Sequence, residues 1–224
     1  MKETKKKKSR LFSFRYLMHD IIRITASIGL IWYRPKHLYL DKKYKKIRKG
    51  AIVSSNHISL EDPIRLMMGI WYRRLHMVAM DELFGTGFRR HMFKTWFQCI
   101  PISRENFSMS SFKEIVEHLD HNEVVIIFPE GRVNTDPKGI KAFKSGMLMM
   151  ALKSDVPIVP VYLKRKKHFY SRVVIAIGTP IYVKNYNTNG VTTIQDFDRA
   201  IEDIQKMEKE LENLCYQKEK KQDE

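Results

Sequence analysis

Short apolar runs alternate with longer amphipathic stretches from about residue 50 to the end of the chain. Runs of four to eight apolar residues rich in Val and Ile are typical of strands buried in a sheet. They predict strands at 51–55, 76–80, 99–103, 123–128, 157–163 and 172–178. Apolar residues with the spacing of a helix predict helices at 63–75, 108–122, 142–155 and 194 to about 221.

The order of these segments predicts an α/β fold with a mostly parallel central sheet flanked by helices, because strands joined by long helices form crossover units. Residues 81–96 are expected to be helical or irregular, since Gly85 and Gly87 interrupt them. Ligands of such folds bind beyond the carboxyl ends of the strands. Three polar loops follow predicted strands, and we expect them to meet at one edge of the sheet: NHISLED, SREN and FPEGRVN.

The composition is that of a folded globular chain. A hydrophobic content of 43% in 224 residues is sufficient for one domain with a sizeable core and an appendage. The two cysteines, Cys99 and Cys215, lie far apart and have no metal-ligand spacing. A disulfide framework is therefore not expected, and a reducing compartment fits better.

Positive charge is concentrated near the N-terminus. The chain has a formal net charge of +16, and its first 50 residues contain 16 Lys or Arg against three acidic residues, a net charge of +13. A basic region this localised predicts an anionic partner, either a phospholipid surface or nucleic acid. A contribution to solubility alone is the simpler alternative.

Residues 14–35 are rich in Ile, Leu and aromatic residues, but charged side chains interrupt them. The longest uninterrupted apolar stretch, 24–33, is about half as long as a membrane-spanning helix. No signal-peptide pattern fits. We expect an amphipathic helix in the membrane interface, with an ordinary core helix as the alternative. The predicted organisation is a basic tail at 1–10, a membrane-interface helical segment at 11–35 and an α/β domain at 36–224.

The first polar loop places His57 five residues before Asp62, with Pro63 directly after. Proline disfavours helical angles in the preceding residue and suits the first turn of a helix, so the segment predicts strand, turn and helix. In a turn the two side chains can meet, and an imidazole oriented by a carboxylate is a general base for a hydroxyl. No GxSxG nucleophile motif is present, so the hydroxyl would belong to a substrate. The alternative is a helix-capping Asp62 beside an incidental His57.

The other two polar loops carry candidate anion-binding residues. Pro129 and Gly131 predict a tight turn that presents Glu130 and Arg132 at its tip. Arg104 follows another predicted strand. Two guanidinium groups on neighbouring loops can clamp a phosphate dianion.

Four segments, taken together and in this order, resemble the motifs of the glycerophospholipid acyltransferase family. The first is an asparagine followed by an HX4D motif, at 56–62. The second is the stretch QCIPISR at 98–104, and the third is FPEGR at 128–132. The fourth is the apolar segment VPIVPV at 156–161, so the resemblance covers about residues 50–165.

The resemblance implies transfer of a fatty acyl group from an acyl thioester to the free hydroxyl of 1-acyl-sn-glycerol-3-phosphate, which gives phosphatidic acid in phospholipid biosynthesis. His57, oriented by Asp62, would remove the hydroxyl proton. Guanidinium groups would hold the acceptor phosphate, while Lys144 would add positive charge or be a surface lysine. The implied substrate-binding residues are Arg104, Glu130, Gly131, Arg132 and Lys144.

The implied partners are an anionic phospholipid membrane surface, lysophosphatidic acid, and an acyl carrier protein or coenzyme A thioester as co-substrate. Nucleic acid is not an expected partner, and neither a metal nor an organic cofactor is expected. The family has an N-terminal helical membrane anchor, which residues 11–33 match in character. The expected location is the cytoplasmic face of the cell membrane, with monotopic or peripheral attachment.

Some residues depart from the family pattern and leave the acceptor open. Gln98 replaces a common glycine, Ser103 a frequent aspartate, and Arg132 directly follows the glycine of its motif. An acyltransferase for another lysolipid or hydroxyl is one alternative. A non-catalytic basic protein that binds membranes or nucleic acid is an alternative from a different class. A metal site at His118 and His121 is the weakest interpretation, because the sequence suggests no partners for them.

Overall fold

The computed structural model describes residues 16–29, 35–102, 108–129, 140–164, 172–187 and 192–220. The strands in this part of the chain are β1 (Lys36–Tyr39), β2 (Ala51–Ser55), β3 (Leu75–Met80), β4 (Cys99–Ile102), β5 (Val124–Ile127), β6 (Ile158–Leu163) and β7 (Val174–Ile177). The α-helices are α1 (Leu17–Gly29), α2 (Asp62–Gly69), α3 (Phe88–His91), α4 (Met109–Asp120), α5 (Ile140–Lys153) and α6 (Ile194–Lys220). Shorter helical turns occupy Lys42–Tyr44, Asp81–Leu83, Met92–Trp96 and Val183–Tyr186.

The strands form one sheet in the order β1-β7-β6-β2-β5-β3-β4. The five strands from β6 to β4 are parallel, whereas β7 pairs antiparallel with β6 and β1 pairs parallel with β7. The prediction of a mostly parallel sheet flanked by helices is confirmed. β1 is missing from the predicted strands because it has four residues at the edge of the sheet, of which one is buried.

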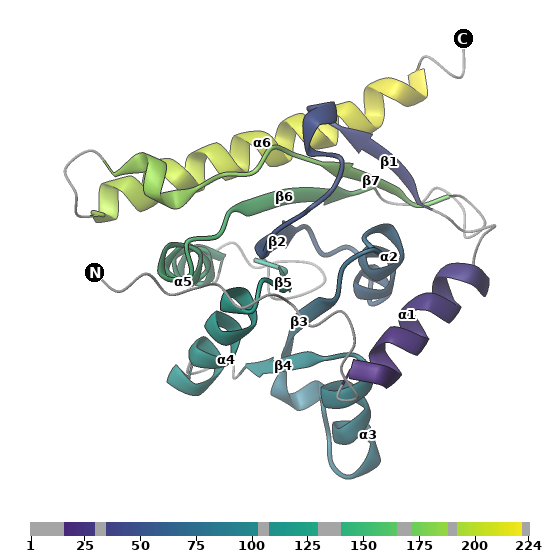
Figure 1. Cartoon of the computed structure of the whole chain (residues 1–224). Coiled ribbons are helices and arrows are strands. Elements are labelled where there is room, and N and C mark those ends of the chain that lie inside the picture. The colour runs from purple at the N-terminus through teal and green to yellow at the C-terminus, as the bar shows by residue number, and fades with distance from the viewer. Residues whose placement is uncertain are drawn as a thin grey trace.

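Helices cover both faces of the sheet (Figure 1). Val53 and Ile126 pair across β2 and β5 and face α2, whereas the neighbouring pair Ile52 and Val125 faces α4, α5 and α6. Successive residues of a strand point to opposite faces, so a strand covered on both sides must be apolar throughout. This explains why the central strands appear in the sequence as continuous apolar runs.

The helix predicted at 63–75 ends at Gly69, and β3 begins at Leu75. The apolar pattern continues past the helix end, but the backbone leaves helical angles at Ile70. The guanidinium group of Arg73 donates hydrogen bonds to the backbone carbonyls of Arg48 and Asn122, in segments far away in the sequence. These contacts hold the chain between α2 and β3 as a loop.

The long helix α6 packs along β6 and β7 (Figure 1). Lys164, directly after β6, is buried, and its Nζ donates to the carbonyl of Cys215 at 3.3 Å. The same ammonium group lies 4.8 Å from the ring centroid of Tyr216, a distance typical of cation–π contacts. The hydroxyl of Tyr162 donates to Oε1 of Glu212 at 2.9 Å. The C-terminal part of α6 is therefore fastened to the end of β6.

Helix α1 directs polar side chains toward the domain and apolar side chains away from it. Nδ1 of His19 lies 3.0 Å from the carbonyl oxygen of Trp96, and Asp20 forms a buried ion pair with Arg74 at 2.6 Å. The large apolar side chains of α1 that are 41–47% exposed are Leu17, Met18, Ile21 and Ile24. No helix within the described residues is both long and apolar enough to cross a bilayer. The other parts of the predicted interface segment, 11–15 and 30–34, lie outside the described residues.

Candidate active site

The turn after β2 brings His57 and Asp62 together. Asp62 is the first residue of α2 and Pro63 lies in its first turn, so the predicted sequence of strand, turn and helix is confirmed. Nδ1 of His57 is 3.0 Å from Oδ2 of Asp62. A carboxylate only accepts hydrogen bonds, so Nδ1 carries the donated proton and the lone pair of the neutral ring is on Nε2. This tautomer can accept a proton at Nε2.

The carboxylate of Asp62 is fully buried and is held by several donors. Its Oδ2 accepts the backbone N–H groups of Ile58 at 2.6 Å and Ser59 at 2.7 Å, and its Oδ1 accepts Nη1 of Arg65 at 3.0 Å. A buried charge is tolerated when it is hydrogen bonded and paired in this way. The N-cap position of α2 is Glu61, and Asp62 binds the preceding turn instead of capping the helix. The capping alternative for Asp62 is therefore wrong.

The ring of His57 stacks on Phe128, which follows β5. Their ring centroids are 4.4 Å apart and the planes are inclined by 25°. The side chain of His57 is 16% exposed, so the stack leaves part of the imidazole accessible. Because β2 and β5 are adjacent parallel strands, the loops that follow them begin side by side. The first and third polar loops thus meet at one edge of the sheet, as predicted, in their described residues.

Asn56 joins the same turn to the end of β6. Its Nδ2 donates to the carbonyl of Leu163 at 3.0 Å, and its Oδ1 accepts the backbone N–H of Leu163 at 2.7 Å. Asn56 is the first residue of the first family motif, but the sequence indicates no role for it. No local pattern could reveal one, because the partner lies 107 residues away. The two hydrogen bonds fix the residue directly before His57.

The position of His57 in the sheet is one at which α/β proteins bind ligands. Helix α2, which follows β2, packs on one face of the sheet, and α5, which follows the adjacent strand β5, packs on the other face (Figure 1). Neighbouring strands whose connections diverge in this way form a topological switch point, and ligands bind at the carboxyl ends of such strands. His57 and Phe128 directly flank this point.

The predicted substrate-binding side chains lie outside the residues that the structure describes. The following four lie outside the described residues: Arg104, Glu130, Gly131 and Arg132. Lys144 lies in α5, but its side chain also lies outside the described part of the chain. β4, which precedes Arg104, is three strand positions from β2, or roughly 14 Å at the usual strand spacing. The second polar loop therefore starts from the same edge of the sheet as His57.

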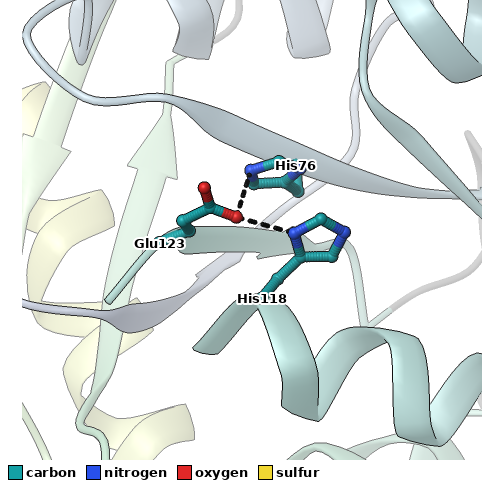
Figure 2. Close-up of side chains that lie close together, drawn as sticks. All are labelled: His76, His118 and Glu123. Carbon is teal, nitrogen blue, oxygen red and sulfur yellow. Dashed lines mark hydrogen bonds and ion pairs between the residues drawn. The ribbon is translucent and has the colours of Figure 1, made fainter. Parts of the chain in front are cut away.

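The expectation that His118 has no partner is wrong. Nδ1 of His118 lies 2.7 Å from Oε2 of Glu123, and its ring stacks on that of His76 with centroids 3.9 Å apart (Figure 2). Both partners belong to segments that the apolar pattern marks as strands, which hides their polar side chains from sequence analysis. This cluster lies at the amino ends of the parallel strands β3 and β5, whereas His57 lies beyond the carboxyl end of β2.

Comparisons with known proteins identify the family of the chain. The family model described as Acyltransferase matches residues 36–164, more than half of the chain. The 1-acyl-sn-glycerol-3-phosphate acyltransferase of Bacillus subtilis is 30% identical over 111 residues, which cover 50% of this chain and 54% of that protein. The corresponding enzyme of Limnanthes alba is 32% identical over 170 residues, covering 70% and 58%.

A human relative and a solved structure extend the comparison. Human 1-acyl-sn-glycerol-3-phosphate acyltransferase beta is 28% identical over 158 residues, covering 69% of this chain and 52% of the human protein. These alignments span about half the length of each curated relative. The crystal structure of the 1-acyl-sn-glycerophosphate acyltransferase of Thermotoga maritima has the same fold, with a TM-score of 0.60 and 21% identity over 90% of this chain and 81% of that one. The chain belongs to the glycerophospholipid acyltransferase family.

Proposed function

We propose that this protein transfers a fatty acyl group from an acyl thioester to the free hydroxyl of lysophosphatidic acid, giving phosphatidic acid and a free thiol. The observation that carries the proposal is the hydrogen bond of 3.0 Å between Nδ1 of His57 and the buried carboxylate of Asp62 at the switch point of the sheet. The names of the curated relatives supply the substrate class.

The chemical step requires one base and no covalent enzyme intermediate. Nε2 of His57 accepts the hydroxyl proton while the hydroxyl oxygen attacks the thioester carbonyl carbon. Asp62 stabilises the imidazolium that forms, as the aspartate does in a hydrolytic triad. The tetrahedral intermediate then expels the thiolate, which takes the proton from His57 and leaves as the thiol. Binding both substrates at one site converts a bimolecular encounter into an oriented reaction.

The proposed acceptor contacts come from the loops that start at the same sheet edge as His57. Arg104 and Arg132 would hold the phosphate of the acceptor, because guanidinium groups bind phosphate in a bidentate manner. Glu130 and the turn at Gly131 would bind the acceptor hydroxyls or order the arginines, and Lys144 would add positive charge. These roles rest on the family resemblance of the motifs.

The proposed site of action is the cytoplasmic face of a membrane, with α1 lying in the lipid interface. Two features support this. α1 exposes a face of large apolar side chains while its two buried polar residues, His19 and Asp20, bind the domain, the reverse of a helix on a water-facing surface. The first 50 residues carry a net charge of +13, which complements anionic lipid. The acceptor and the product could then remain in the bilayer during the reaction.

Release of thiol from an acyl thioester, with lysophosphatidic acid as acceptor, tests the proposed reaction. The full chain in phospholipid vesicles is assayed with acyl-coenzyme A and with an acyl carrier protein thioester. His57→Ala should abolish acceptor-dependent release, and His91→Ala, at an exposed histidine on α3, should leave it unchanged. Wild-type activity in the His57→Ala protein would exclude His57 as the base. Release with other lysolipids only would assign a different acceptor.

Sedimentation with vesicles of anionic phospholipid tests the membrane proposal. The double variant Ile21→Asp/Ile24→Asp places charge on the exposed face of α1 without touching the ion pair that fastens the helix. Its bound fraction should fall steeply, whereas Ile194→Asp, at a residue that is 80% exposed at the start of α6, should bind like the wild type. Equal binding of all three proteins would contradict a role for α1.

A further inference from the structure

His76, His118 and Glu123 form a cluster of potential metal ligands that the proposed reaction does not use (Figure 2). His76 lies on β3, His118 on α4, and Glu123 directly before β5, so three separate elements contribute one side chain each. The cluster lies at the starts of β3 and β5. His57 follows the end of β2, which runs parallel to β5, so the two sites occupy opposite edges of the sheet.

The donor atoms of the cluster are already close to one another. Nε2 of His76 is 3.0 Å and Nδ1 of His118 is 2.7 Å from the same carboxylate oxygen, Oε2 of Glu123. One ligand atom from each of the three residues lies within 4.8 Å of the others. Ligands bound tetrahedrally to Zn²⁺ at about 2.0–2.1 Å are separated by about 3.3 Å. To reach that separation, the contact of His76 would lengthen by about 0.3 Å and that of His118 by about 0.6 Å.

The second observation concerns the hydrogen bonds of His76. This residue is 0% exposed. Neither of its ring nitrogens has a hydrogen-bond partner among the described residues, and the contact of Nε2 with Glu123 is one of distance without hydrogen-bond alignment. A buried polar atom without a partner is costly, and nearly all such atoms in proteins are satisfied. A metal ion bound to Nε2 would satisfy this nitrogen.

We propose that His76, His118 and Glu123 bind a divalent transition-metal cation, with Zn²⁺ as the first candidate. Two imidazoles and one carboxylate are a ligand set that Zn²⁺ accepts, whereas Mg²⁺ and Ca²⁺ prefer oxygen ligands alone. The rings of the two histidines stack at an inclination of 26°, and both direct a nitrogen toward the same oxygen (Figure 2). The side chain of His118 is 14% exposed, which gives the ion a route of entry.

The charges around the cluster determine the net charge of the proposed site. Glu123 is the only anionic ligand of the three, and the positive charge of Arg73 acts on its carboxylate. Arg74 is paired with Asp20 and adds little net charge. The bound ion therefore keeps a net positive charge, and its fourth position takes water or a small anion. The site links α4 to two strands, so its role is to hold these elements together.

Metal content of the full-length protein tests the proposal. The protein is stripped with a chelator, loaded with Zn²⁺, desalted and analysed for metal by mass spectrometry. The wild type should retain one ion per chain, and His118→Asn and Glu123→Gln should each lose it. The matched control is His121→Asn on the same helix end, where Nδ1 binds the carbonyl of Glu117, and it should retain the ion.

Loading with Co²⁺ gives a readout that needs no variant and no activity. The wild type should show visible absorption bands typical of tetrahedral Co²⁺, and X-ray absorption should detect two imidazole ligands. If the variants fail to fold, as judged by circular dichroism, the spectra of the Co²⁺-loaded wild type alone test the proposed site. The proposal is overturned if the wild type retains no stoichiometric metal, if His118→Asn retains as much as the control, or if fewer than two imidazoles bind the ion. None of these outcomes depends on the proposed acyl transfer.

Discussion

Replacing Asp62 by asparagine removes one negative charge from the candidate active site and keeps the shape of the side chain. Two backbone N–H groups and Nδ1 of His57 all donate to Oδ2, while Arg65 donates to Oδ1. The amide oxygen of the asparagine should take the position that faces three donors. Its NH2 group then faces the guanidinium group of Arg65, and two donors oppose each other.

The geometry sets the size of both effects. With the amide oxygen facing His57, the ring keeps its tautomer, but the imidazolium that forms during proton transfer loses its counter-charge. Opposite charges about 4 Å apart attract by about 4 kcal/mol at the effective dielectric constant of a protein, which corresponds to about 10³-fold in rate. Arg65 keeps its contact with Glu61 at 2.7 Å, so the loss of stability should be about 1–3 kcal/mol.

The assay follows acceptor-dependent thiol release at saturating concentrations of both substrates, together with urea unfolding. Asp62→Asn should lower kcat by about 10³-fold and leave KM nearly unchanged, because the carboxylate contacts the base and not the substrate. Glu61→Gln is the matched control. This neighbouring acid also binds Arg65 but is 65% exposed, and the partner of Nδ1 of His57 is Asp62. The kcat of Glu61→Gln should therefore be that of the wild type. A loss of less than tenfold in a folded Asp62→Asn protein would refute the assignment of Asp62.

Three further results are expected. Gly50→Ala should destabilise the fold by about 1–3 kcal/mol in urea unfolding, because the added carbon would lie 2.9 Å from the backbone oxygen of Leu119; unchanged stability would contradict this close approach. Burial raises the pKa of the Cys99 thiol to about 12, and Cys215 is also buried, so neither should react with a thiol reagent until the protein unfolds. Burial also lowers the pKa of His37 below its usual value, although the ring binds the last carbonyl of α2. The unfolded state then takes up the proton first, so stability should fall as the pH drops below about 6.5, and this loss should be smaller in His37→Gln.

Periodicity was sufficient to predict the central elements of the fold because their environment is uniform. β2 and β5 are buried on both faces, and every position is apolar or small as a result. The direction of β7 depends on its connection instead. Residues 164–173 are too few for a helical crossover from β6, and strands joined by short connections pair antiparallel.

The candidate site was predictable where its chemistry is local. His57 and Asp62 lie within one turn, and Pro63 fixes where that turn ends, so spacing and residue type predicted that the two side chains can meet. They left the capping alternative open, and only the four motifs taken together favoured a base. Contacts between distant segments leave no local signal. Asn56 and Leu163 show this within the site. The same reason explains why the histidine cluster on the opposite edge was missed, since its three residues come from two strand segments and a helix.

The end of β6 connects the C-terminal helix α6 to the turn that carries His57. Leu163 holds Asn56 by two hydrogen bonds, and the next residue, Lys164, is held by the end of α6. A change in α6 can therefore loosen the turn that carries His57. The segment 36–164 that matches the family contains the turn that carries His57 but not helix α6. We expect shortening of α6 to lower turnover and to leave the acceptor preference unchanged, because α6 supports the turn that carries His57.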